Sequence, residues 1–85
     1  MPEISRFYGI IILMYISDHN PPHFHIRYGE YKAIMTIESE ILTGSLPLSV
    51  ANKVAEWVSY HKDELLENWE RLSHGEPPSK IEPLK

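Results

Sequence analysis

Apolar and polar positions change their spacing about halfway along the chain. Over residues 9–16 nearly every position is apolar and several are β-branched, which predicts a strand covered on both sides. Two further strand-like runs, His23–Tyr28 and residues 31–37, are separated only by Gly29-Glu30, and glycine at the first turn position is typical of a type II′ hairpin. Short strands are also expected over residues 4–7 and 41–43. The first half of the chain therefore predicts a small antiparallel β-meander.

The predicted hairpin determines which of its side chains share a face. Counting outward from the turn pairs Tyr28 with Tyr31, and successive residues then alternate between the two faces of the sheet. The apolar face holds Phe24, Ile26, Tyr28, Tyr31, Ala33 and Met35. The other face holds His23, His25, Arg27, Lys32 and Thr36, together with Ile34. One face is thus expected to join the core and the other to carry chemistry.

From Pro47 onwards the apolar spacing becomes helical. Positions three and four residues apart form one stripe: Ala51, Val54, Val58, His61, Leu65, Trp69 and Leu72. Pro47 suits a first helical turn, either Ser45 or Ser49 could cap the helix, and Gly75 with Pro77-Pro78 should end it. The pattern predicts one long bent helix, or a helical hairpin that restarts at Asp63 after a bend near His61.

The chain as a whole predicts a single α+β domain over residues 1–85. Its parts are a β-rich half over residues 1–44, a helical half over 46–74 and an extended tail over 76–85. Ile81 and Leu84 could dock that tail as an arm, but chain ends usually fray, and fraying is the expectation here.

Composition narrows the classes of function. With 85 residues, 42% of them hydrophobic, one core of marginal stability is expected. The absence of cysteine excludes disulfides and thiolate ligands, which leaves imidazoles and carboxylates to bind any metal. The longest apolar run is too short to cross a bilayer, so no membrane association and a cytoplasmic location are expected. The net charge of −4 arises in the later half of the chain, so nucleic acid could bind only locally.

Three of the five histidines lie in one short segment around Pro21-Pro22. His23 and His25 are two residues apart on one strand face, and the preceding turn could bring Asp18 or His19 beside them. Such a set could bind zinc, nickel or manganese and leave a position open for water. Alternatively, the histidines are exposed strand residues and His19 and Asp18 only stabilise the turn.

Two other interpretations involve residues near this segment. Arg27, Lys32 and Tyr28 could contact an anion or substrate while the imidazoles exchange protons, although the few cations weaken this idea. His61 could be a further ligand if the helix brings it to the strand histidines, but a histidine on an apolar stripe is more often a core residue. If the helix covers the Phe24 face, His61 cannot reach them.

The helical half offers a candidate surface for a protein partner. Glu64, Glu67 and Glu70 would lie at the rim of such a surface, and Trp57, which lies off the main stripe, nearer its centre. The simpler alternative is that these carboxylates are a solvated helix face and that the tryptophans are core residues.

Four segments together resemble a bacterial family called domain of unknown function 4160. They are Ile4-Ser5-Arg6-Phe7-Tyr8-Gly9, Asp18-His19-Asn20-Pro21-Pro22-His23-Phe24-His25 with Tyr28-Gly29-Glu30, Glu64-Leu65-Leu66-Glu67-Asn68-Trp69, and Ile81-Glu82-Pro83-Leu84. The most specific part is the string from Asp18 to His25. The resemblance implies no reaction. It implies that genes of this family often lie beside a gene for a second small domain, and that such gene pairs are similar to toxin–antitoxin modules.

These observations leave three functional hypotheses. The preferred one is an interaction component of a toxin–antitoxin-like two-gene module, whose partner is a small protein encoded nearby or a second copy of the chain. The second is a metal-dependent hydrolase or small nuclease that uses His19, His23 and His25. The third is a metal-binding structural or sensing domain.

Overall fold

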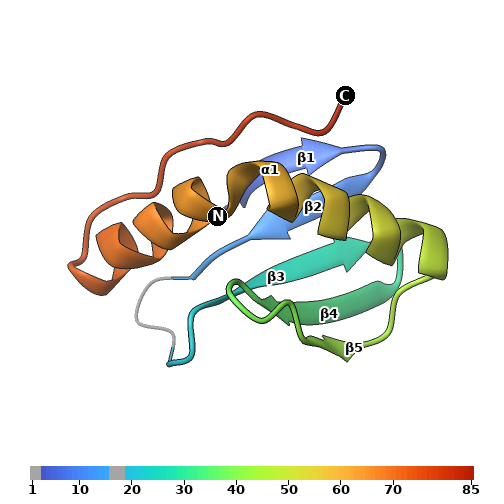
Figure 1. Ribbon diagram of the computed structural model, residues 1–85, viewed down its shortest axis with the longest axis horizontal. Helices are drawn as coiled ribbons and strands as arrows, with labels where there is room; N and C mark the ends of the chain where they lie inside the picture. Colours follow the sequence, from blue (N-terminus) through green and yellow to red (C-terminus); the bar gives the residue numbers. More distant parts are fainter. Residues whose placement is uncertain (1–2, 16–18) are drawn as a thin grey trace.

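A meander of five antiparallel strands, in chain order, lies against one long helix (Figure 1). The computed structural model describes residues 3–15 and 19–85. The elements are β1 (Glu3–Phe7), β2 (Ile10–Leu13), β3 (His23–Tyr28), β4 (Tyr31–Thr36), β5 (Leu42–Gly44) and α1 (Leu48–Ser73). This architecture confirms the predicted α+β fold and selects the single long helix over the helical hairpin. No helix among the described residues is long and apolar enough to cross a membrane.

The β3–β4 hairpin has the register that was predicted from its turn. Tyr28 is opposite Tyr31, and the pairing continues without a shift to His23 and Thr36. Gly29 adopts the left-handed region with φ of 56°, which glycine enters without steric cost. The alternating faces expected for β3 and β4 are therefore the faces that the sheet has.

The strand predicted over residues 9–16 is shorter in the structure. Gly9 has φ of 78° and belongs to the β1–β2 turn, so β2 begins only at Ile10. It ends at Leu13. Ile16, at the end of the predicted strand, lies outside the described residues. The expected short strands on either side are present as β1 and β5.

Helix α1 begins without the side-chain cap that was expected. Pro47 is the capping residue, and neither Ser45 nor Ser49 supplies a capping hydrogen bond, because the helix starts directly at Leu48. The predicted bend is present: His61 has φ of −130° and ψ of 20° within an otherwise continuous helix. The helix ends after Ser73, close to the predicted Gly75, whose φ is 76°.

The core lies between α1 and one face of the sheet. Phe24, Ile26, Ala33 and Met35 are buried there, as the alternation predicted. The helix contributes Val50, Val54, Trp57, Val58, Leu65, Trp69 and Leu72. Tyr31 shares the face of these strand residues but is exposed at its end, where it stacks on the half-buried Tyr28. Helix α1 thus covers the Phe24 face of the sheet and not the face of His25 and Arg27.

The prediction that Trp57 belongs to a partner surface is wrong, because Trp57 lies in the core. Its side chain is 0% exposed, and its ring lies 5.3 Å from that of Phe7 and 6.1 Å from that of Phe24. The stripe that faces the sheet is wide enough to include Trp57, which lies at its edge on the side of Val54 away from Val58 on the helical wheel. A residue with no exposed surface cannot form the centre of an interface on this fold.

The expectation that the C-terminal tail frays is wrong. The Ile81 amide donates a 2.8 Å hydrogen bond to the Ile4 carbonyl, so the tail runs along the outer edge of β1 (Figure 1). Asn68, which is only 1% exposed, both donates to and accepts from the backbone of Ser79, and Trp57 Nε1 donates to the Glu82 carbonyl. The tail is therefore docked as an arm, which is the alternative that Ile81 and Leu84 had suggested.

Candidate functional site

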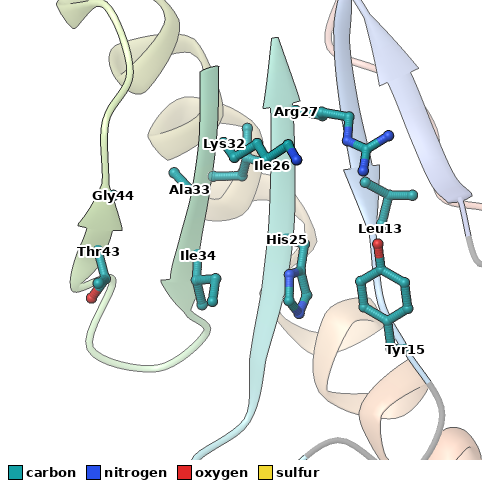
Figure 2. A pocket seen from close by; sticks show the side chains of 10 residues that line it. All are labelled: Leu13, Tyr15, His25, Ile26, Arg27, Lys32, Ala33, Ile34, Thr43 and Gly44. Carbon is teal, nitrogen blue, oxygen red and sulfur yellow. The ribbon is translucent and has the colours of Figure 1, made fainter. Parts of the chain in front are cut away.

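One face of the sheet is covered by no described element, and we call it the open sheet face. Residues of neighbouring strands project from it in register. Ile11 of β2 is opposite both Arg6 and Arg27, and Leu13 is opposite His25. Ile34 of β4 is opposite both His25 and Thr43. Its residues are Arg6, Ile11, Leu13, His25, Arg27, Lys32, Ile34 and Thr43. Figure 2 shows part of this face with α1 behind the strands. The hairpin alternation had predicted its β3 and β4 members.

A hollow of about 280 Å³ lies on the open sheet face (Figure 2). Its floor is apolar: Leu13 is 1% exposed and Ile34 is half-buried. Polar side chains surround that floor: Tyr15, His25, Arg27, Lys32 and Thr43. The hollow is open and shallow, so it suits a side chain of a partner or a small group better than a buried ligand.

Tyr15 is a site residue that the sequence analysis did not identify. Its ring meets that of His25 edge to face, with centroids 4.5 Å apart. Tyr15 follows Leu13 by two residues and therefore keeps the same side of the chain, although β2 has ended. Extending the alternation past the end of the strand would have found it.

The open sheet face has two cations that no carboxylate of the described residues pairs with. Arg6 is different, because its guanidinium bonds both carboxylate oxygens of Glu3 at 2.8 and 3.1 Å. That hydrogen bond and the charge of Arg6 lower the pKa of Glu3. Arg27 and Lys32 are directly opposite each other on β3 and β4, and within residues 3–15 and 19–85 neither forms an ion pair. The local charge of this face is thus positive on a chain of net charge −4.

Tyr28 does not belong with these two cations. Its ring stacks on Tyr31 with centroids 6.4 Å apart, and it packs against the core on the helix side of the sheet. The period of two puts Tyr28 and Arg27 on opposite faces because they are adjacent in β3. The expected anion contact of Arg27, Lys32 and Tyr28 is therefore corrected to Arg27 and Lys32, with Tyr15 as the aromatic on their face.

The strand histidines and His19 form a row beside the hollow. The ring centroids of His19 and His23 are 5.5 Å apart, and those of His23 and His25 are 5.4 Å apart. The turn that returns the chain to β3 contains a cis peptide bond between Asn20 and Pro21. The structure thus brings together the three histidines that the sequence pattern selected.

His23 is the buried member of this row. It is 4% exposed and its ring lies 5.2 Å from that of Trp69 on α1. Its Nδ1 donates a 2.7 Å hydrogen bond to the carbonyl oxygen of Pro21, which can only accept. This bond fixes the orientation of the ring against the turn.

The described residues alone do not complete the metal site that the sequence pattern predicted. Asp18, its expected carboxylate ligand, lies outside the described residues. Among residues 3–15 and 19–85, no group of three or more histidine, aspartate or glutamate side chains is arranged to hold a metal ion.

His61 does not join the row. It lies at the kink of α1, where its Nδ1 contacts the Glu64 carboxylate and its ring is 5.5 Å from that of Trp57. Because α1 covers the Phe24 face, His61 lies on the opposite side of the sheet from His25. His61 therefore cannot be an additional ligand beside the strand histidines, and its contact is with Glu64 of the same helix.

The acidic surface of α1 is exposed as expected. Glu64, Glu67 and Glu70 point to solvent and contact His61, Arg71 and His74 respectively. The aromatic residue among them is Tyr60, which is 68% exposed, and not Trp57. Helix α1 thus carries five carboxylates against three cations, whereas the open sheet face carries Arg27 and Lys32.

Comparisons with known proteins identify the family but no activity. No curated protein matches the chain, and no solved structure matches it. A family model described as a domain of unknown function (DUF4160) matches residues 9–70, which include β2 to β5, the histidine row and most of α1. The match covers more than half of the chain, and the protein belongs to this family of domains of unknown function.

Proposed function

We propose that this protein is an interaction component of a toxin–antitoxin-like two-gene module, and that it binds its partner protein through the open sheet face. One observation carries the proposal: a whole face of the sheet lacks a covering element among the described residues, and it combines an apolar floor with cations at its margin. Apolar surface surrounded by polar groups is typical of protein interaction sites.

The charge of this face favours a different polypeptide over a second copy of the chain. A symmetric dimer uses the same patch on both subunits. A two-fold axis through the hollow would bring Arg27 and Lys32 of one copy towards Arg27 and Lys32 of the other, and neither residue forms an ion pair within the described part of the chain. Like charges brought together in this way oppose association. An acidic partner avoids that cost.

A partner would also stabilise a small fold. A domain of 85 residues buries a smaller share of its surface than a large one does, so its stability is expected to be modest. Any protein that binds only the folded state raises the free energy of unfolding in proportion to the logarithm of its concentration.

Size-exclusion chromatography with light scattering tests the proposal. The chain is measured alone and after co-expression with the protein encoded by the adjacent gene, and co-elution is expected. Ile34→Asp should abolish co-elution because it places a carboxylate on the apolar floor. Leu48→Asp is the matched control, since Leu48 is exposed at the start of α1, away from this face. A monomer that never co-elutes, or a stable dimer of the chain alone, would contradict the proposal.

A metal-dependent hydrolase or small nuclease is the second candidate function, and it rests on the proximity of three imidazoles, which among the described residues do not by themselves form a metal-binding group. The ring centroids of His19 and His23 are 5.5 Å apart, and those of His23 and His25 are 5.4 Å apart. The same row would serve a metal-binding structural or sensing domain. Turnover of RNA or a phosphoester would separate the enzyme from the sensor.

Titration calorimetry with zinc, nickel and manganese tests the metal itself. His19→Ala/His25→Ala should abolish binding, whereas His74→Ala, which removes an exposed histidine after α1, should not. Binding should weaken in acid because a protonated imidazole cannot bind a metal. If the double variant binds as weakly or as strongly as the unmodified protein, the histidine row is not a metal site.

A further inference from the structure

The strongest unassigned feature is the pair of cations above the apolar floor of the hollow. Arg27 and Lys32 are directly opposed across β3 and β4, an arrangement that costs stability unless an anion lies nearby. Glu3 neutralises Arg6, but within the described residues no carboxylate does the same for Arg27 or Lys32. An external anion bound at this place would remove the repulsion.

The side chains of the hollow suit an anion with apolar neighbours. Figure 2 shows the Arg27 guanidinium and the Tyr15 hydroxyl on either side of Leu13, pointing towards each other. Both groups donate hydrogen bonds, and guanidinium matches a carboxylate with two parallel bonds. Leu13, Ala33 and Ile34 provide apolar contact directly beside them.

The number of cations favours a protein segment over nucleic acid. Proteins that hold a nucleic acid backbone commonly neutralise several phosphates, and a chain of net charge −4 repels a polyanion. Two cations beside an apolar floor instead match one or two carboxylates with an adjacent apolar side chain. Five carboxylates of this chain lie on α1, which covers the far side of the sheet, and Glu3 is paired with Arg6.

We infer that the hollow receives an acidic segment of the partner protein, with a carboxylate held by Arg27 and Lys32 and a neighbouring apolar side chain on Leu13 and Ile34. This inference rests on the proposed function, because it names the chemistry of the partner that the open sheet face binds. Tyr15 adds its hydroxyl to the carboxylate contacts, and His25 positions Tyr15 through their edge-to-face contact.

Selection from a library of random displayed peptides tests this inference even before the partner is identified. The complete chain is the bait, and the selected peptides should be enriched in aspartate or glutamate next to leucine, isoleucine or valine. The strongest peptide is then titrated into the protein by NMR, where amide signals of β3 and β4 should shift. An RNA octamer of mixed sequence is titrated in parallel and should bind more weakly.

Three variants test whether the peptide binds through Arg27 and Lys32. Arg27→Gln/Lys32→Gln should weaken the strongest peptide by at least about tenfold, since a charge-assisted hydrogen bond contributes more than the energy of a tenfold change. Lys80→Gln and Lys85→Gln are controls that remove charge from the tail and should leave affinity within about twofold. Unchanged amide spectra away from β3 and β4 show that the variants are folded.

The possible results separate this inference from the proposed function. Peptides rich in basic residues, peptides that bind the double variant equally well, or tighter binding of the RNA octamer would each overturn the inference. If Arg27→Gln/Lys32→Gln still co-elutes fully with the adjacent-gene protein while Ile34→Asp does not, the interaction stands and the carboxylate contact is wrong. If the selection is empty and no protein co-elutes, both are wrong.

Discussion

His23 and His25 differ in their surroundings although they project from the same face of β3. His25 lies beside the hollow, half-buried and in contact with Tyr15. His23 is at the end of the strand, where Trp69 of α1 reaches its ring. The first can therefore meet a ligand directly, whereas the second also holds the end of the sheet against the helix.

Replacing His23 should lower stability more than replacing His25. His23→Ala removes the hydrogen bond to Pro21 and the ring contact with Trp69, and we expect a loss of about 1–3 kcal/mol from the polar contact alone. His23→Asn should recover part of this loss because its amide can replace the Nδ1 donor. Urea denaturation measures all three variants. Equal stability of His23→Ala and His25→Ala would show that the burial of His23 contributes nothing.

At the scale of elements, α1 is held mainly by its buried stripe. Leu65 is fully buried, and Leu65→Ala should lower the free energy of unfolding by roughly 2–5 kcal/mol, as expected for a truncated core residue. Leu48→Ala provides the comparison, because Leu48 is the most exposed large apolar residue of the helix and should be nearly neutral. Thermal and urea denaturation give both values. A neutral Leu65→Ala would contradict the core described for α1.

One buried side-chain amide, that of Asn68, anchors the tail beside the bonds that Ile4 and Trp57 form with it. Asn68→Ala removes both of its hydrogen bonds to Ser79 and should cost about 1–3 kcal/mol. Proteolysis of the tail should become faster in this variant. Asn52→Ala, on the exposed side of α1, should change neither property. If Asn68→Ala leaves the tail protected, the bonds from Ile4 and Trp57 and the burial of Ile81 are enough to hold it.

The elements differ in how far their sequence predicts them. The β3–β4 register and the stripe of α1 follow from local periodicity and one glycine turn, so they could be predicted. The docked tail could not, because its anchors are the backbone oxygens of Ile4 and Glu82 and the side chain of Asn68, none of which leaves a periodic signal. Which face α1 covers also depends on tertiary packing, and it separates His61 from the histidine row.

The candidate site shows the same division. His23, His25, Arg27 and Lys32 were assigned to one face from alternation, and the structure has them there. Tyr15 was not predicted because it lies beyond the end of β2. Tyr28 was grouped with Arg27 because the two are adjacent in the chain, although adjacent strand residues face opposite sides of the sheet. Trp57 was placed outside because a narrow stripe excluded it.

At the scale of the whole molecule, α1 has an excess of carboxylates and the open sheet face has unpaired cations among the described residues. The exposed carboxylates of α1 lie on one side, and the cations of the open sheet face lie on the other. An acidic partner approaching the protein is therefore repelled by α1 and attracted by the sheet. Such a field orients the encounter and affects the association rate more than the final affinity.

Binding on this face should stabilise the entire fold. With the adjacent-gene protein at about one hundred times its dissociation constant, the gain is about 2.7 kcal/mol, and a domain of this size should then melt roughly 10–20 °C higher. Differential scanning calorimetry over a series of partner concentrations measures the shift, which should grow with concentration. Ile34→Asp should abolish it, and Leu48→Asp should retain it. A melting temperature that is independent of the partner would mean that the open sheet face is not where that protein binds.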